Sequence, residues 1–179
     1  MSTTGHRMNL DALNAAAPRD VVAALGGIYE HSSWVAEAVA SGRPFASVDA
    51  LAEAMAQVVA QAEADAQMAL IRAHPQLAGR AAIAGELTES STREQRGAGL
   101  DQCTPEEFAR LTALNDAYQA KFGFPFILAV KGHTRDSILE ALAARLHNAP
   151  AQERAEALRQ IDRIARFRLE ALIEQCSEL

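Results

Sequence analysis

Three side chains of this sequence could together perform acid/base chemistry on a small anion: His74, Glu94 and Arg168. An imidazole exchanges protons near neutral pH, and a carboxylate can orient it. A guanidinium can pair with an anionic group of a substrate. The sequence therefore favours acid/base work on a small anionic molecule, without a cofactor.

Each of these side chains also has a structural explanation. Ser91 and Glu94 stand three residues apart, which fits a capping box at a helix start. A lone histidine such as His74 is more often structural than catalytic. Arg168 lies close to an apolar stripe, where it either reaches solvent or pairs with a buried group. A cap and a ligand site are compatible, because a helix start presents free amides and a positive dipole end.

The segment around His74 is expected to be a junction between two helices. Pro75 pushes the residue before it out of the helical region, and proline is favoured at the first position of a helix. Apolar residues at spacings of three and four predict a long helix over 47–73. A short helix over 75–84 is expected to follow. His74 would then occupy a fixed, non-helical position.

Helix-start signals recur along the rest of the chain. Thr104, Pro105 and two acidic residues form a strong start, and Gly123 stops the helix that follows. Thr134 is expected to cap another helix. The predicted helices include 9–16, 18–25, 28–40, 134–147 and 151–176.

Residues 124–130 break the helical pattern. Pro125, with aromatic and β-branched neighbours, favours an extended segment. The sequence offers no second strand to pair with it, so its backbone groups need other partners. One solution is that some of them face a ligand. The predicted fold is all-α: a single-domain bundle of about eight helices over 9–179, with one short extended segment near 124–130 and a disordered N-terminus over 1–8.

Composition restricts the classes of function. The chain has 179 residues, a net charge of −6 and 5% aromatic residues, so neither a basic footprint nor a base-stacking surface for nucleic acid is expected. Its apolar runs are too short to cross a membrane. Two distant cysteines form no disulfide framework, and the N-terminus lacks a secretory pattern, so we expect a cytoplasmic protein.

The familiar motifs of metal and nucleotide sites are missing from the sequence. It contains no HExxH, P-loop, GxGxxG or GxSxG. The five histidines are scattered without metal-ligand spacing, so no metal site is predicted. Cys103 lies near a helix start, but nothing marks a base that would activate it.

Several runs of residues resemble the OHCU decarboxylase family, whose substrate is 2-oxo-4-hydroxy-4-carboxy-5-ureidoimidazoline (OHCU). The resemblance covers the chain from about Asn9 to Ile173. Gln76 and Ser33 depart from the residues common in the family, at positions not expected to do chemistry. The runs are HPQLAG at 74–79, GELT at 85–88, Ser91 with EQ at 94–95, AGL at 98–100, LGGIYEHS at 25–32 with Trp34, and FPFI at 124–127 with AV at 129–130 and Gly132.

The resemblance implies an all-helical homodimer that converts OHCU to (S)-allantoin in urate degradation, with no metal or organic cofactor. It assigns the catalytic histidine to His74 and a guanidinium to Arg168, and we add Glu94 as the catalytic carboxylate. The substrate contacts implied by the resemblance fall on Pro75, Ser91, Thr92, Arg93, Glu94, Gln95, Phe126, Ile127, Leu128, Ala129, Val130 and Arg168.

Two other functions remain open from the sequence. One is a decarboxylase or hydrolase for a related ureido or imidazoline compound on the same scaffold. The other is a non-catalytic helical interaction protein, in which the three side chains would lie apart.

Overall fold

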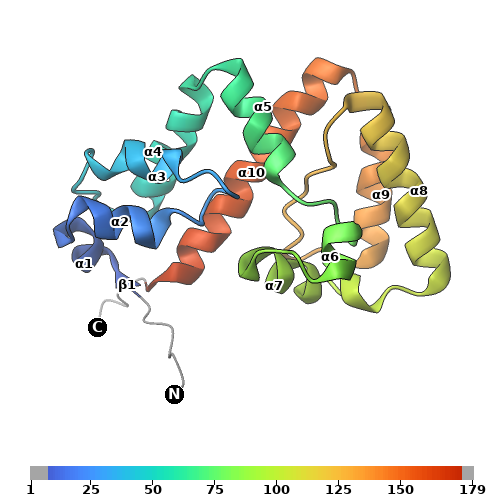
Figure 1. Ribbon diagram of the computed structural model, residues 1–179, viewed down its shortest axis with the longest axis horizontal. Helices are drawn as coiled ribbons and strands as arrows, with labels where there is room; N and C mark the ends of the chain where they lie inside the picture. The colour runs from blue at the N-terminus through green and yellow to red at the C-terminus, as the bar shows by residue number, and fades with distance from the viewer. Residues whose placement is uncertain (1–7, 175–179) are drawn as a thin grey trace. The chain divides into compact units, whose positions relative to one another are not determined.

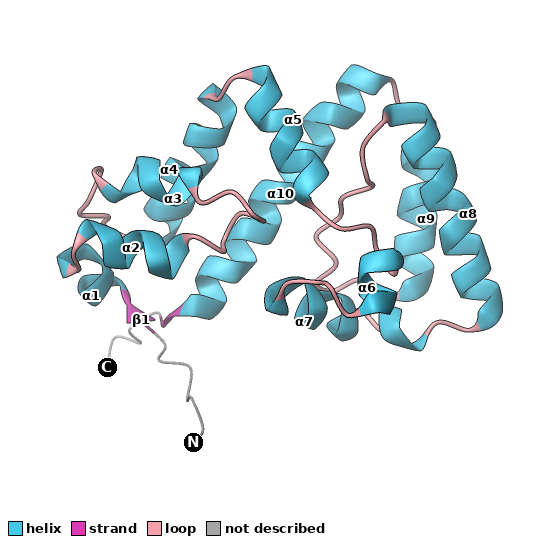
Figure 2. Cartoon of the chain, in the orientation of Figure 1, coloured by secondary structure: helices cyan, strands magenta, loops and turns pink. Residues whose placement is uncertain are grey.

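A computed structural model describes residues 8–174, which form ten α-helices and one short 3-10 turn. Eight of the helices have seven or more residues, so the predicted all-helical class is confirmed (Figure 2). None of the helices in this range is both long and apolar enough to cross a membrane. The helices are α1 (Leu10–Ala15), α2 (Pro18–Leu25), α3 (Trp34–Ala40), α4 (Val48–Gln61), α5 (Ala64–Ala73), α6 (Arg80–Ala84), α7 (Glu89–Gly97), α8 (Pro105–Phe122), α9 (Arg135–Arg145) and α10 (Pro150–Leu172), and the 3-10 turn η1 is Leu100–Gln102.

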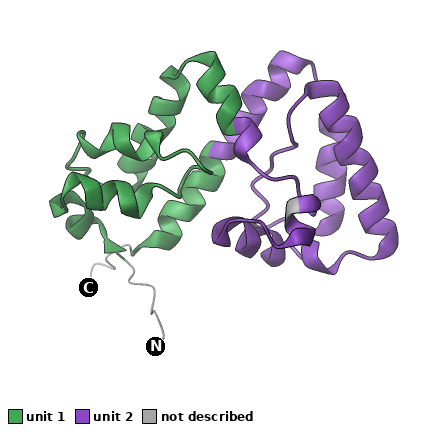
Figure 3. Ribbon diagram, viewed as in Figure 1, with its two compact units in different colours: residues 1–70, 162–179 green, residues 71–161 purple. Residues whose placement is uncertain are grey.

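The backbone contacts group the chain into two compact units (Figure 3). Unit 1 contains the chain up to Leu70 and from Asp162 onward, and unit 2 contains Ile71–Ile161. Helices α5 and α10 each contribute residues to both units. A single domain over 9–179 stays a prediction.

Unit 1 is built on helices that bury one apolar face each. Helix α3 contacts both α2 and α4 (Figure 1). The side chain of Arg43 donates to the backbone carbonyls of Leu13 and Ala16, which satisfies the last turn of α1. The core side chains of this unit include Leu13, Val21, Leu25, Val35, Leu51, Met55, Val59 and Leu169.

The two ends of the described chain pair in unit 1. Strand β1 (Met8–Asn9) runs parallel to β2 (Ile173–Glu174), with Met8 opposite Ile173. The predictions of disorder at residue 8 and of helix at 173–174 are therefore wrong. Two-residue strands have no apolar alternation that a sequence could display. The other residues predicted to be disordered, 1–7, and the predicted helical residues 175–176 lie outside the described range.

The predicted long helix over 47–73 is two helices. Helix α4 ends at Gln61 and α5 begins at Ala64. The side chain of Gln67 donates to the backbone carbonyls of Val59 (2.9 Å) and Ala60 (3.3 Å). These carbonyls belong to the last turn of α4, where a helix lacks internal donors. The break is stabilised by a side chain of the next helix, which apolar spacing does not reveal.

Unit 2 contains α8 and α9, whose predicted ends can be compared with the structure. Thr104 and Glu107 form a reciprocal capping box at the start of α8, and Gly123 ends it with φ of 76°. Thr134 caps α9, which contacts α8 (Figure 1). These boundaries were all predicted from the sequence. Buried side chains of this unit include Leu111, Tyr118, Ile138, Leu142 and Ile161.

Candidate functional site

His74 follows the last residue of α5 directly and is buried, with 7% of its surface exposed. The expected helix over 75–84 is wrong in its first half, because α6 begins only at Arg80. Residues 75–79 form a turn instead, in which Ala78 has a φ of 49°. A left-handed residue cannot continue an α-helix. His74 does occupy the fixed, non-helical position that was predicted.

Two amide side chains hold the turn that follows His74. The Ala78 N–H donates to Gln95 Oε1 at 2.9 Å, and Gln95 Nε2 donates to the Gln76 carbonyl at 3.4 Å. Asn115 Nδ2 of α8 donates to the Leu77 carbonyl at 3.0 Å. These bonds satisfy backbone groups of a buried turn that is not helical. The turn is thereby fixed to α7 and α8.

Three of the predicted substrate contacts on α7 lie on one side of the helix. Its N-cap is Thr88, whose hydroxyl accepts from the Ser91 N–H at 3.2 Å, so the expected cap at Ser91 is wrong. Ser91, Glu94 and Gln95 are spaced three and four residues apart, which places them on one side of the helix. Ser91 and Gln95 are buried and Glu94 is half-buried.

Arg93 lies on a different side of the same helix. Its side chain is largely exposed and pairs with Glu89 at 3.5 Å, one turn earlier. Thr92 is half-buried, and its hydroxyl donates to the Thr88 carbonyl at 2.9 Å. The structure thus separates Arg93 from the buried face formed by Ser91 and Gln95.

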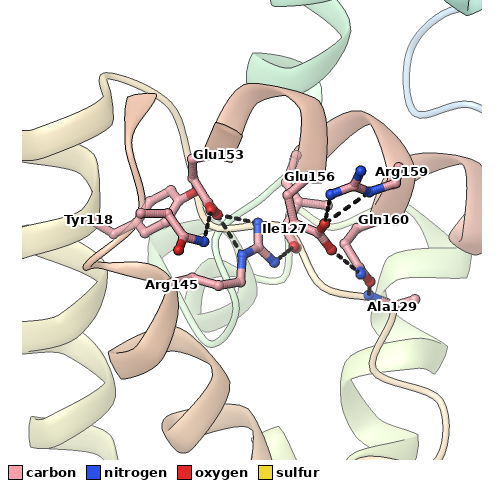
Figure 4. A network of polar contacts seen from close by, with 9 residues as sticks. Tyr118, Ile127, Ala129, Arg145, Glu153, Glu156, Arg159 and Gln160 are labelled. Carbon is pink, nitrogen blue, oxygen red and sulfur yellow. Dashed lines mark hydrogen bonds and ion pairs between the residues drawn. The ribbon is translucent and has the colours of Figure 1, made fainter. Parts of the chain in front are cut away.

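Residues 125–130 form neither helix nor strand, as predicted for an extended segment. All of them are buried, although the segment is connecting chain. The Ile127 carbonyl accepts from Arg145 Nη1 at 2.5 Å, and the Ala129 N–H donates to Gln160 Oε1 at 3.0 Å (Figure 4). Backbone groups of alternate residues point to the same side of an extended chain. Arg145 and Gln160 therefore hold one edge of this segment.

The N–H groups on the opposite edge of the segment differ in their hydrogen bonding. Within residues 8–174, the N–H groups of Leu128 and Val130 make no hydrogen bond. Both residues are buried. Buried backbone groups are nearly always paired, so these donors need a partner from outside the chain, such as water or a ligand. Two N–H groups on one edge suit oxygen acceptors.

A buried charged cluster lies behind the held edge (Figure 4). Glu153 is fully buried and accepts from Arg145 Nε at 2.5 Å and from the Tyr118 hydroxyl at 2.6 Å. Burial raises the pKa of Tyr118 above its usual value, and the hydrogen bond to Glu153 raises it further. Asn148 Nδ2 donates to the second oxygen of Glu153 at 3.0 Å. The Arg145 guanidinium also lies 4.4 Å from the centre of the Phe126 ring.

Arg168 belongs to unit 1, where it is buried and paired. Its Nη1 donates to Glu30 Oε2 at 2.8 Å and to the Gly27 carbonyl at 3.3 Å. The exposed fraction is 8% for Arg168 and 2% for Glu30, so the guanidinium is held in the interior rather than extended into solvent. Arg168 was expected either to reach solvent or to pair with a buried group, and the structure shows the pairing.

A second bond joins the same loop to α10. The Tyr29 hydroxyl donates to Asp162 Oδ1 at 2.8 Å. Burial raises the pKa of Asp162 to about 6, although the hydrogen bond from Tyr29 acts in the opposite direction. Burial also raises the pKa of Tyr29. The loop between α2 and α3 is therefore fixed to α10 by two side-chain pairs.

Sequence reasoning missed the residues that support the predicted ones: Glu30, Asn115, Arg145, Glu153 and Gln160. Each is a buried polar residue, and a partner distant in sequence cannot be recognised from spacing.

For the rival nucleophile Cys103, burial raises the pKa of the thiol, which disfavours the reactive thiolate. Among the described residues, no three His, Cys, Asp or Glu side chains gather in a way that could hold a metal ion.

The fold and these groups define an all-helical protein with a candidate acid/base site. A family model described as OHCU decarboxylase matches residues 14–170, and the chain belongs to this family. A 2-oxo-4-hydroxy-4-carboxy-5-ureidoimidazoline decarboxylase of Halalkalicoccus jeotgali is 41% identical over 93% of this chain and 92% of its own length. The uric acid degradation bifunctional protein PucL of Bacillus subtilis is 41% identical over 94% of this chain.

A solved structure is also similar. The crystal structure of (S)-allantoin synthase superposes with a TM-score of 0.77 and 33% identity over 93% of this chain. This chain spans 54% of that synthase chain and 33% of the Bacillus subtilis protein. The similarity therefore concerns one part of those longer proteins and nearly all of the Halalkalicoccus jeotgali protein.

Proposed function

We propose that this protein is a carboxy-lyase that converts OHCU to (S)-allantoin and CO2 in urate degradation. The observation that carries the proposal is the buried His74, fixed at the end of α5 by its turn, in a chain that belongs to the OHCU decarboxylase family. The names of the Halalkalicoccus jeotgali relative and of the similar solved structure support the substrate and the product.

The substrate itself can accept the electrons that decarboxylation releases. It carries a carboxylate and a hydroxyl on one ring carbon, next to a C=N bond. When the bond to CO2 breaks, the electron pair enters the ring and the C=N nitrogen takes up a proton. The hydroxyl then loses its proton as a carbonyl forms, and the neighbouring carbon is protonated. The ring thus performs the task for which other decarboxylases use an organic electron sink.

In this proposal His74 is the general acid/base. It removes the proton of the substrate hydroxyl and returns a proton to the ring. Glu94 orients His74 or binds the ureido nitrogens. Protonation of one face only sets the handedness of allantoin, so a fixed imidazole gives a single enantiomer.

The remaining predicted residues bind and orient the ring. The free backbone donors of Leu128 and Val130 suit carbonyl oxygens of the substrate. Ser91 and Gln95, on the buried face of α7, complete the polar contacts, with Pro75 beside His74. For Arg168 we propose the role of a positive charge for an anionic group of the substrate.

Assembly and location are part of the same proposal. We propose a homodimer in the cytoplasm, acting without a cofactor.

The experiment that tests this function follows freshly generated OHCU by ultraviolet absorbance and circular dichroism. Spontaneous decay gives racemic allantoin, so the protein should both accelerate the decay and produce the dichroism of one enantiomer. An unchanged decay that yields racemate would refute the proposal. Stronger processing of a related ureido compound in direct competition would assign the scaffold to that compound instead.

A further inference from the structure

We infer that Gln160 and Arg145 are positioning residues, which hold the segment 126–130 in the conformation that binds substrate. This inference rests on the proposed function of that segment. Both residues bond to the backbone of the segment and influence substrate binding only by fixing its conformation. Neither side chain is expected to touch the substrate.

The position of Gln160 gives the first argument. Its Oε1 accepts the Ala129 N–H at 3.0 Å, and its Nε2 donates to Glu156 Oε1 at 2.8 Å (Figure 4). An ionised carboxylate only accepts hydrogen bonds, so the amide must turn its nitrogen toward Glu156 and its oxygen toward Ala129. Glu156 therefore determines which atom of Gln160 meets the segment.

The carboxyl group of Glu156 is held in its ionised form. Burial alone would raise the pKa of Glu156, but hydrogen bonds from Gln160 and Arg159 hold it below its usual value. The carboxylate stays ionised over the neutral range, so the orientation of the Gln160 amide is constant there.

Arg145 fixes the same edge two residues earlier. Its Nη1 donates to the Ile127 carbonyl while Nε donates to the fully buried Glu153. Because Ile127 and Ala129 are anchored on one side, the intervening Leu128 must direct its N–H to the other side. The two anchors thus determine where the backbone donors of Leu128 and Val130 point.

This arrangement uses side chains where a sheet would use a neighbouring strand. An isolated extended segment has no strand partner, yet it must be ordered to a fraction of an ångström if its amides are to bind a ring in one orientation. Two polar side chains from α9 and α10 supply that order on one edge and leave the other edge available.

Gln160→Met provides the test, because it keeps the length of the side chain and removes the acceptor for Ala129. We expect KM for OHCU to rise about tenfold with kcat little changed, because binding by the segment is lost equally in the ground and transition states. The exchange of the backbone amide hydrogens of 126–130 should also become faster. The matched control is Gln152→Met, at an exposed position of the same helix.

A conservative variant separates positioning from packing. Gln160→Glu keeps an oxygen that accepts the Ala129 N–H but places a second carboxyl group beside Glu156, so KM should return toward the wild-type value at acidic pH, where the two carboxyl groups can share one proton. If Gln160→Met leaves KM and amide exchange unchanged in an active enzyme, the inference is wrong while the proposed function stands. If the wild-type protein does not act on OHCU, both are wrong.

Discussion

Arg168 and Glu30 form a buried ion pair with 2.8 Å between Nη1 and Oε2, and the same guanidinium nitrogen also donates to the carbonyls of Gly27 and Ile28. The pair links α10 to the loop between α2 and α3, which are distant in sequence. A charge so deeply buried is tolerated only because its partner is present. Any role of Arg168 toward substrate is therefore combined with a structural role in unit 1.

Removing one member of the Arg168–Glu30 pair should destabilise the protein strongly. We expect Arg168→Met and Glu30→Leu each to lower the free energy of unfolding by about 3–5 kcal/mol, because each removes one charge of a buried ion pair. The double variant should recover much of that stability, since neither charge remains. Urea unfolding of the four proteins measures these differences.

The same four proteins test the substrate role. If Arg168 supplies charge to the substrate, the double variant should regain stability without regaining turnover. A double variant that is both stable and as active as the wild type would show that Arg168 is structural only.

His74→Asn should abolish stereoselective turnover and leave the fold intact. Asparagine keeps a polar side chain of similar length but cannot act as an acid or base near neutral pH. Far-ultraviolet circular dichroism should match the wild type, and OHCU should decay to racemic allantoin at the spontaneous rate. The control is His147→Asn, at an exposed position after α9, which should keep full activity. Near-normal turnover by His74→Asn would remove His74 from the mechanism.

Local signals in the sequence predicted the ends of several elements. Asn9, Thr104 and Thr134 cap the helices that follow them, because a cap is formed by residues within four positions of each other. Pro125 and Gly123 likewise mark the non-helical segment correctly. Around α7 the sequence predicted a cap by Ser91 with Glu94, whereas the N-cap in the structure is Thr88, whose hydroxyl accepts from the Ser91 N–H.

Features that depend on distant partners could not be predicted. The helix expected over 28–40 begins only at Trp34, because Tyr29 and Glu30 bond to α10 more than 130 residues later. The turn over 75–79 likewise depends on Gln95 and Asn115. The polar residues of the site stay predictions from the sequence, while the buried side chains that hold their backbone in place can be recognised only in the folded chain.

The stability of the protein should fall as the pH rises through the titration of Asp162. Its pKa is raised to about 6 in the folded protein, against about 3.9 in an unfolded chain. Between these values the folded state binds more protons than the unfolded state, so stability decreases with increasing pH. Above pH 6 the folded protein carries a half-buried charge.

Asp162→Asn isolates this effect, because asparagine can still accept the Tyr29 hydrogen bond and does not titrate. We expect the wild type to lose stability relative to this variant between about pH 4 and pH 6. Thermal unfolding of both proteins across that range gives the difference. Parallel curves for the two proteins would contradict the raised pKa.

Gln95→Met should impair catalysis through the turn after His74. The substitution removes the acceptor for the Ala78 N–H and the donor to the Gln76 carbonyl, so the turn loses its two bonds to α7. We expect kcat to fall about tenfold or more, because the imidazole is no longer held in place for proton transfer. Steady-state kinetics with OHCU measures the change.

Two further variants separate positioning of the turn from simple packing. Gln95→Glu keeps the acceptor for the Ala78 N–H and should recover part of kcat, whereas Gln119→Met, at an exposed position of α8, should behave as the wild type. Since Gln95 is also a predicted substrate contact, KM distinguishes the two roles: positioning of His74 changes kcat, and loss of a direct contact raises KM. A rise in KM alone would assign Gln95 to the substrate, and an unchanged enzyme would show that Asn115 suffices to hold the turn.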